Sequence, residues 1–256
     1  MLRSPPHHLL LAHGLAIARM REQDAGSQLG ITLNFSPYHP ASEADADAAR
    51  RMDARQNRFF LEPVLLGRYG EDNMAELNLG RWIADGDLEV ISSPLDFLGV
   101  NYYRRLVVRA GSPQGTPTRF IGCEDVELVD RGGPKSTMGW PIDPDGLYEL
   151  LMRLHREFAP PPLYITENGV SCEDTLEDQE RIDFLDAHLR AAHRALAGGV
   201  DLRGYFVWSL LDNFEWALGY AKRFGLVRVD YETLERTPRA SARWFRDVVA
   251  RNGPEP

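Results

Sequence analysis

Four short apolar segments constrain the possible folds of this chain more than any other feature of its sequence. They span residues 30–34, 96–103, 163–169 and 204–209, and each begins with apolar residues and ends with polar or aromatic ones. Their apolar residues form unbroken runs rather than alternating with polar ones, which is typical of strands buried on both faces. The sequence therefore predicts four interior β-strands.

Longer segments with helical character lie between and around these strands. Residues 7–24 carry apolar side chains at helical spacing, and a charge-rich helical stretch runs from residue 42 to residue 61. Further helices are expected at 145–158, 174–197 and 239–251. Since two parallel strands can be joined only by a long crossover, strands that alternate with helices predict an α/β fold with a parallel sheet.

We expect one domain over residues 1–256, folded as a partial (β/α)8 TIM barrel. A complete eight-stranded barrel takes about 250 residues. Only four strands of barrel type are found, because long insertions occupy residues 104–143 and 210–237. Within the second insertion, residues 224–233 predict a hairpin. Four strands cannot close a barrel, so two sheet edges would stay open, which folded proteins normally avoid.

Composition and charge exclude several kinds of partner. A net charge of -9 leaves no basic stripe for nucleic acid or for an anionic membrane. Residues 9–12 are apolar, but they are too few for a membrane span and lack the flanks of a signal peptide, so we expect one face of a helix. Cys123 and Cys172 match no metal-ligand spacing, which favours reduced thiols and a cytoplasmic location.

Polar and aromatic side chains gather where the predicted strands end. In a parallel barrel, the carboxyl ends of the strands and the loops that follow them build the active site. The residues at these ends are Asn34, Asn101, Tyr103, Glu167, Asn168 and Trp208. We therefore expect a functional site at this end of the sheet.

Glu167, in the pentapeptide 165–169, is the strongest candidate for a reactive group. A carboxylate in a cleft at the end of a buried strand can attack an anomeric carbon and form a covalent glycosyl intermediate. The alternative is a surface turn, because Asn-Gly is a common tight-turn dipeptide and glutamate is common on surfaces. The pentapeptide taken alone favours the turn.

A second cluster, residues 207–220, contains the residue types that bind sugars. Aromatic faces cover the apolar C–H patches of a sugar, and carboxylates accept hydrogen bonds from neighbouring hydroxyls. Trp208, Glu215 and Trp216 supply both types within nine positions. Tryptophans that merely fill a core are the alternative. The acidic and amide residues between these tryptophans make the core-filling alternative less convincing.

These segments resemble the signature segments of glycoside hydrolase family 1, the β-glucosidases. The resemblance extends over residues 7–251 and is carried by residues 98–103, 138–140, 165–169, 207–220 and 236–241. It implies a retaining β-glycosidase that acts on small-molecule β-glycosides or oligosaccharides without a metal or other cofactor. Phospho-sugar members of the family tend to carry Ser and Lys where Glu215 and Trp216 stand, so glucosides or galactosides are favoured over 6-phosphoglycosides.

The resemblance also implies a role for each matching residue. Glu167 is expected to be the catalytic nucleophile, and Tyr103 is expected to hydrogen-bond it and hold its orientation and ionised state. Trp208 is expected to stack under the glycone. Glu215 is expected to bind the sugar hydroxyls O4 and O6, and Trp216 is expected to donate to a neighbouring hydroxyl.

Three more substrate-binding roles come from the same resemblance. Trp140 is expected to line the aglycone side, Phe224 to pack near the glycone pocket, and Asn101 to support the site rather than to react. For Tyr103, Trp140 and Phe224, ordinary packing stays open as an alternative, because aromatic residues routinely fill strand ends.

One part of the family pattern is missing. Members carry a Thr-(Phe/Leu)-Asn-Glu-Pro segment at the end of the fourth strand, whose Glu is the general acid/base, and no such segment occurs here. Residues 61–63 come nearest, but Glu62 ends a helical stretch and lacks the preceding Asn. Residues 7–24 correspond to the helix after the missing strand, so we expect strands 5–8 of the barrel. Residues 1–6 match nothing in the family.

Three hypotheses for the function follow. The first is an enzyme fragment, either from a truncated or mis-called gene or as one half of a split enzyme whose partner is a complementary N-terminal half-barrel. Such a fragment carries the nucleophile of a β-glycosidase, lacks the acid/base and is inactive alone. The second is a carbohydrate-binding half-barrel without chemistry. The third is an interaction protein, whose open sheet edges pair with another half-barrel or with a second copy.

Overall fold

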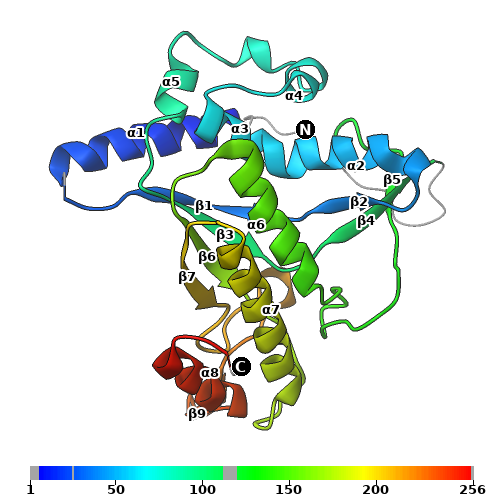
Figure 1. The fold of residues 1–256 in the computed structure, drawn as a ribbon, viewed down its shortest axis with the longest axis vertical. Helices are drawn as coiled ribbons and strands as arrows, with labels where there is room; N and C mark the ends of the chain where they lie inside the picture. Colours follow the sequence, from blue (N-terminus) through cyan, green and yellow to red (C-terminus); the bar gives the residue numbers. More distant parts are fainter. Residues whose placement is uncertain (1–5, 25, 112–119, 255–256) are drawn as a thin grey trace. The chain divides into compact units, whose positions relative to one another are not determined.

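The structure, a computed structural model, describes residues 6–24, 26–111 and 120–254 (Figure 1). Its main sheet has the strand order β1-β3-β6-β7. The four strands are β1 (Gly30–Phe35), β3 (Phe97–Tyr102), β6 (Leu163–Asn168) and β7 (Leu202–Val207). Each overlaps one of the predicted apolar segments, so the four strands are confirmed, although β7 begins and ends two residues earlier than predicted and leaves Trp208 just beyond it. The α/β architecture with a parallel sheet is consistent with the expected partial barrel.

The helices next to these strands agree with the sequence, with one exception. Helices α1 (His7–Gln23), α6 (Pro144–Phe158) and α8 (Ala240–Arg251) lie within one residue of the predicted bounds. Helix α7 (Gln179–Ala197) begins later than the predicted residue 174. The segment before it is held in a non-helical conformation, because the carboxylate of Asp178 accepts a hydrogen bond from the backbone N–H of Ser241 at 2.9 Å.

The charge-rich stretch that begins near residue 42 folds as a series of short helices rather than as one. They are η1 (Glu43–Asp45), α2 (Ala46–Asp53), the π-helix η2 (Ala54–Arg58) and α3 (Phe59–Leu66). Helix α3 ends at Gly67, whose φ of 63° is a left-handed conformation that glycine adopts without strain. Three more short helices follow, namely α4 (Glu71–Glu76), η3 (Leu79–Arg81) and α5 (Asp87–Ile91).

Both predicted insertions contain additional strands. A second sheet has the order β2-β4-β5, in which β2 (Tyr38–Pro40) pairs parallel and β5 (Val126–Leu128) pairs antiparallel with β4 (Leu106–Ala110). The expected hairpin consists of β8 (Val227–Val229) and β9 (Arg236–Pro238), so its second strand begins after residue 233. Residues 112–119 of the first insertion and residues 1–5 lie outside the described residues.

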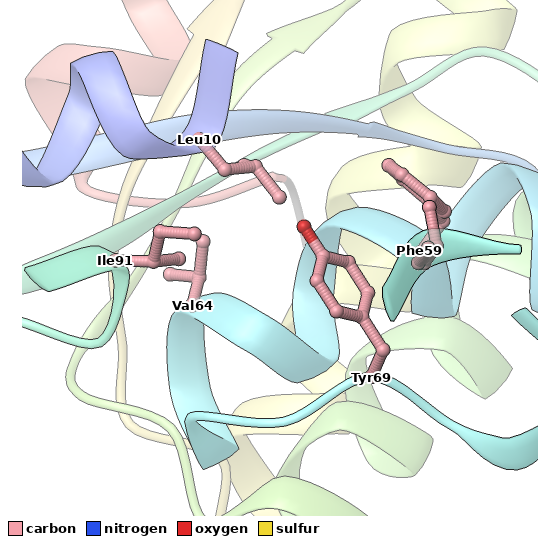
Figure 2. Close-up of a cluster of buried hydrophobic side chains, with 6 residues drawn as sticks. Leu10, Phe59, Val64, Tyr69 and Ile91 are labelled. Carbon is pink, nitrogen blue, oxygen red and sulfur yellow. The ribbon is translucent and has the colours of Figure 1, made fainter. Parts of the chain in front are cut away.

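The chain forms two compact units. The first comprises residues 1–100, 105–131 and 154–163, and the second comprises residues 101–104, 132–153 and 164–256. The first unit has a core of apolar side chains from α1, α3, α5 and the loops between them (Figure 2). Its buried members are Leu10, Phe59, Val64, Tyr69, Leu79 and Ile91.

The second unit is built around residues that follow β6 and face α7. Its buried apolar cluster contains Val170, Cys172, Phe184, Leu185 and Leu226. This unit holds every residue that the sequence places at the site except Asn34, which lies in β1 in the first unit. Across the described ranges of the chain, no helix is both long and apolar enough to cross a membrane.

Candidate active site

The end of strand β6 carries the carboxylate that the sequence singles out. Glu167 and Asn168 belong to β6 itself rather than to a turn, so the Asn-Gly dipeptide does not form the alternative surface turn. Asn168 is fully buried, and its side-chain N–H donates to the carbonyl oxygen of Tyr102 at 2.8 Å. The hydroxyl of Tyr205 donates to the Asn168 side-chain oxygen. This buried amide therefore fixes the strand end that presents Glu167.

Tyr103 holds the Glu167 carboxylate directly. Its hydroxyl donates a hydrogen bond to Oε2 of Glu167 at 2.6 Å. Burial raises the pKa of Tyr103 well above its usual value, and the hydrogen bond to Glu167 raises this pKa further. The phenol therefore keeps its proton and remains the donor, with the carboxylate as its acceptor. Such a contact orients one oxygen of the carboxylate.

The end of β7 lies directly against the end of β6. The backbone N–H of Trp208 donates to the carbonyl oxygen of Asn168 at 2.9 Å. A Cβ atom on Gly169 would stand 1.7 Å from the carbonyl oxygen of Trp208, so only glycine fits at this position. The peptide bond between Trp208 and Ser209 is cis. The backbones that carry Glu167 and Trp208 thus meet at one point.

Three predicted aromatic residues form one cluster beside the carboxylate. The ring of Tyr103 lies 5.5 Å from that of Trp140 and 6.4 Å from that of Phe224, and the latter two rings are 6.3 Å apart. The Arg104 guanidinium lies 4.6 Å from the Trp140 ring centroid. The structure therefore brings Tyr103, Trp140 and Phe224 together from three separate segments. Phe224 is buried, whereas the other two are half-buried.

Asn101 has a supporting position in strand β3. The hydroxyl of Thr166, the residue before Glu167, donates to Oδ1 of Asn101 at 2.7 Å. This bond ties the last residues of β6 to β3 and involves no group that could react with a substrate. The position agrees with a supporting role for Asn101.

Glu215 and Trp216 sit on the loop after β7 and differ in their surroundings. Glu215 is half-buried, and its backbone N–H donates to the carbonyl oxygen of Gly219 at 2.7 Å. Burial raises the pKa of Glu215, and the negative charge of Glu167 raises it further. The two carboxylates are thus close enough to interact electrostatically. Trp216 begins the short helix η4 (Trp216–Leu218) and is 82% exposed, so its ring makes little contact with the rest of the site.

The glutamate nearest to the missing acid/base pattern is engaged elsewhere. Glu62 lies within α3 in the first unit, is buried, and accepts a hydrogen bond from Arg58 at 3.0 Å. The helical placement agrees with the sequence, although α3 continues beyond Glu62 to Leu66.

The chemistry available to the described site is that of carboxylates and aromatic rings. Within the described residues, no group of three or more His, Cys, Asp or Glu side chains could hold a metal ion. Cys123 and Cys172 are buried free thiols, and burial raises the pKa of Cys172 to about 11. An oriented carboxylate next to aromatic rings and a second carboxylate is suited to nucleophilic attack on a sugar.

Sequence reasoning did not identify Asp212 and Arg239 as parts of the site. Asp212 is buried and accepts a hydrogen bond from Arg239 at 3.0 Å. Asp212 stands between Leu211 and Asn213, a setting that gives no clear signal for burial, and nothing in the sequence points to a partner 27 positions away.

Comparisons with known proteins give one consistent result. The family model for glycosyl hydrolase family 1 matches residues 4–254. The bifunctional beta-D-glucosidase/beta-D-fucosidase of Bifidobacterium breve is 44% identical over 95% of this chain and 56% of its own length. Thermostable beta-glucosidase B of Thermobispora bispora is 49% identical over 96% of this chain and 52% of its own length.

Solved structures agree. The psychrophilic beta-glucosidase BglU of Micrococcus antarcticus has a TM-score of 0.89 and 48% identity, over 97% of this chain and 58% of that one. A beta-glucosidase of Thermotoga maritima in complex with deoxynojirimycin has a TM-score of 0.86 and 40% identity, over 97% and 56%. The chain thus spans slightly more than half the length of these relatives.

Proposed function

The chain belongs to glycosyl hydrolase family 1, and from that premise we propose that it supplies the nucleophile of a retaining β-glycosidase acting on β-glucosides. The observation that carries the proposal is the 2.6 Å hydrogen bond from the Tyr103 hydroxyl to Glu167 at the end of a strand. The relatives named beta-glucosidases, and the one solved with deoxynojirimycin, support a glucose-type substrate.

In the proposed reaction, the free electron pair of the Glu167 carboxylate attacks the anomeric carbon of the substrate. A C–O ester bond forms to Glu167 while the bond from the anomeric carbon to the leaving oxygen breaks. The leaving oxygen takes a proton from a general acid, and water then hydrolyses the ester with the same group as a base. Tyr103 keeps the attacking carboxylate in place through its hydrogen bond.

The proposed glycone subsite uses the residues on the loop after β7. Trp208 provides a face for the apolar side of the sugar ring, and Glu215 accepts hydrogen bonds from hydroxyls O4 and O6. Trp216 donates its indole N–H to a neighbouring hydroxyl. Phe224 packs behind this subsite, because its buried ring already contacts Tyr103.

The proposed aglycone side contains Trp140, another ring of the aromatic cluster. Trp140 comes from the loop before α6 and contacts the Tyr103 ring, and it lines the space for the leaving group. Asn101 supports the site through its bond to Thr166.

We further propose that these 256 residues turn over substrate negligibly by themselves. The sequence contains no Asn-Glu-Pro segment, and the carboxylate of Glu62 is already bound by Arg58. General acid–base assistance is worth typically about 10²–10⁴-fold in rate. The N-terminal part of the relatives, which these residues do not span, would supply the acid/base.

The second unit offers a surface for that N-terminal part. Strand β7 is the last strand in the sheet order, and Phe206 within it is 57% exposed. A cavity of about 460 Å³ lies between β7, α7 and α8. Its lining includes the apolar residues Leu189, Leu196, Leu202, Phe245 and Val248. An additional strand and its apolar side chains would cover this edge, as sheet edges require.

Complementation tests the proposal. The chain is mixed with a separately made N-terminal half of the Thermobispora bispora relative and assayed on 4-nitrophenyl β-glucoside. We expect turnover only in the mixture, and none when the chain carries Glu167→Gln. Full turnover by the pure chain would refute the need for a partner. Sugar binding without turnover in either sample would favour a carbohydrate-binding half-barrel, and a stable dimer of the pure chain would favour self-association.

A further inference from the structure

A buried ion pair joins the loop that carries Trp208 and Glu215 to the start of α8. The side chain of Arg239, at the start of α8, is completely buried and so is that of Asp212. The two nitrogens of Arg239 that face Asp212 lie 3.0 Å and 3.2 Å from its two carboxylate oxygens. The same guanidinium donates to the carbonyl oxygens of Gly225 at 2.7 Å and Thr175 at 2.9 Å.

Asp212 connects this pair to the hairpin as well. Its carboxylate accepts hydrogen bonds from the backbone N–H groups of Gly225 at 2.9 Å and Val229 at 3.3 Å. A Cβ atom on Gly225 would lie 2.2 Å from the backbone nitrogen of Asp212, so the two backbones are in direct contact. In addition, the N–H of Ser209 donates to the carbonyl oxygen of Phe224 at 3.1 Å. The loop after β7 is thereby fixed to the hairpin.

Asp212 lies close in the sequence to the proposed sugar-binding residues. Asp212 stands four residues after Trp208 and three before Glu215, so its contacts restrain the loop segment between them. A buried ion pair adds little net stability, because the loss of hydration offsets the attraction between the charges. Each member also has a second charged partner, since Arg223 donates to Asp212 at 3.3 Å and Arg239 donates to Asp174 at 3.0 Å. Removing Asp212 or Arg239 therefore disrupts a buried network of charges rather than a single pair.

We infer that Asp212 and Arg239 are positioning residues for sugar recognition. They hold the loop so that Glu215 reaches the outer hydroxyl groups of the glycone, including the hydroxymethyl group, and Trp208 lies under the ring. The pair thereby sets the preference for sugars that carry a hydroxymethyl group over those that lack one. This inference rests on the proposed function of Glu215.

A second buried pair in the same unit provides a matched control. The side chains of Arg181 and Asp178 are 1% and 0% exposed, and Asp178 also accepts a hydrogen bond from the hydroxyl of Ser241 at 2.6 Å. This pair joins α7 to α8, and neither member bonds to Asp212 or to the residues from Trp208 to Glu215. Arg181 reaches the same loop only at the carbonyl oxygen of Arg223, at 2.7 Å. Asp178→Asn therefore perturbs a comparable buried charge without removing a contact of Asp212.

The experiment compares two ligands across four proteins. Dissociation constants are measured by calorimetry for deoxynojirimycin and for its xylose-configured analogue, which lacks the hydroxymethyl group. The proteins are the unaltered chain, Asp212→Asn, Arg239→Lys and Asp178→Asn, all at a temperature where circular dichroism shows them folded. A variant with less folded protein would weaken the apparent binding of both ligands equally. The ratio of the two dissociation constants would then stay the same.

We expect the unaltered chain to prefer deoxynojirimycin by roughly ten-fold, the effect of one hydrogen bond to a charged group. Asp212→Asn should abolish most of this preference, and Asp178→Asn should keep it. Arg239→Lys should lose part of it, because an ammonium cannot replace all the bonds of a guanidinium.

If Asp212→Asn does not fold, Arg239→Lys carries the test. An unchanged ratio in the loop variants, or an equal loss in Asp178→Asn, would overturn the inference. If the unaltered chain bound neither ligand, the inference would fail, whereas the proposed function is decided separately by the complementation assay.

Discussion

The hydroxyl of Tyr103 donates to Oε2 of Glu167 across 2.6 Å, and so joins the ends of two strands that are 64 residues apart in the sequence. The same ring packs edge-on against Trp140 and Phe224. Tyr103 thus contributes to the site in two separable ways, through the hydrogen bond of its hydroxyl and through the packing of its ring.

Tyr103→Phe should remove the first contribution and keep the second. A charge-assisted hydrogen bond is worth about 1.5–3 kcal/mol, so we expect glycosylation of Glu167 to slow by roughly 10- to 100-fold with little loss of stability. The rate is measured as release of dinitrophenolate from 2,4-dinitrophenyl β-glucoside. Tyr102→Phe is the control, because the Tyr102 hydroxyl donates to the Asp143 carbonyl oxygen at 2.6 Å and not to Glu167. Equal rates for the two variants would contradict the proposed role of Tyr103.

The two carboxylates of the site should titrate as a coupled pair. The charge of Glu167 contributes to the raised pKa of Glu215. Replacement of Glu167 by Gln removes that charge and should lower the pKa of Glu215, although burial keeps it above the ordinary value. The chemical shift of the Glu215 carboxyl carbon, measured by NMR from pH 3 to pH 8, would report this pKa. An unchanged Glu215 pKa in the variant would mean that the two groups are not neighbours.

The raised pKa of Glu215 also has a consequence for stability. Because the folded state binds this proton more tightly than the unfolded state, the contribution of Glu215 to the free energy of unfolding falls as pH rises above about 4.5. Glu215→Gln should therefore become relatively more stable than the unaltered chain between pH 4 and pH 7. Thermal unfolding at several pH values checks this, and a constant difference between the two proteins would speak against it.

His188 should make the second unit sensitive to acid. Its ring is buried, stacks on Phe184 at 3.8 Å, and has a pKa lowered to about 4 by burial. The unfolded state, with an ordinary pKa near 6.5, binds the proton first, so stability is fully present above pH 6.5 and is lost as pH falls toward 4. The loss amounts to about 3 kcal/mol at most.

Urea unfolding at pH 7 and pH 4.5 measures that loss, with His188→Gln as the test and His193→Gln as the control. His193 lies on the same helix, α7, but is exposed. We expect the pH dependence to shrink only in His188→Gln. A similar pH dependence in all three proteins would assign the acid sensitivity to other groups.

The contact between the ends of β6 and β7 should not tolerate a methyl group. Gly169→Ala places a Cβ atom 1.7 Å from the Trp208 carbonyl oxygen, and overpacking of this kind costs about 1–3 kcal/mol or more. Gly80→Ala is the control, since a Cβ there meets nothing within 4 Å. Urea midpoints should fall for the first variant and hold for the second. Unchanged stability of Gly169→Ala would show that the two strand ends do not meet as described.

Most of the main sheet could be predicted from the sequence, because apolar residues predominate in each of its strands. The predicted burial on both faces holds in the middle of β3, where residues 98–100 are buried in succession. It is wrong for β7, in which no residue is buried and Phe206 is 57% exposed. The small sheet of β2, β4 and β5 could not be predicted. Its strands have three to five residues, and β2 pairs with a strand more than 60 positions away.

The site was predictable in part for a similar reason. Glu167 and Tyr103 stand at the carboxyl ends of predicted strands, and parallel strands bring these ends together. The burial of Asp212 against Arg239 depends on contacts between the loop, the hairpin and α8. No local pattern encodes such a pairing. The 82% exposure of Trp216 was likewise not predictable, because it depends on how the loop turns at η4.

The most direct test of the central claim uses a substrate whose leaving group needs no acid. 2,4-Dinitrophenyl 2-deoxy-2-fluoro-β-glucoside can lose dinitrophenolate without protonation, while its fluorine slows hydrolysis of the ester that forms. We expect mass spectrometry to find one fluoroglucosyl group per chain, attached to Glu167, and no label in Glu167→Gln. A label on another residue, or equal labelling of the Gln variant, would contradict the assignment of Glu167 as the nucleophile.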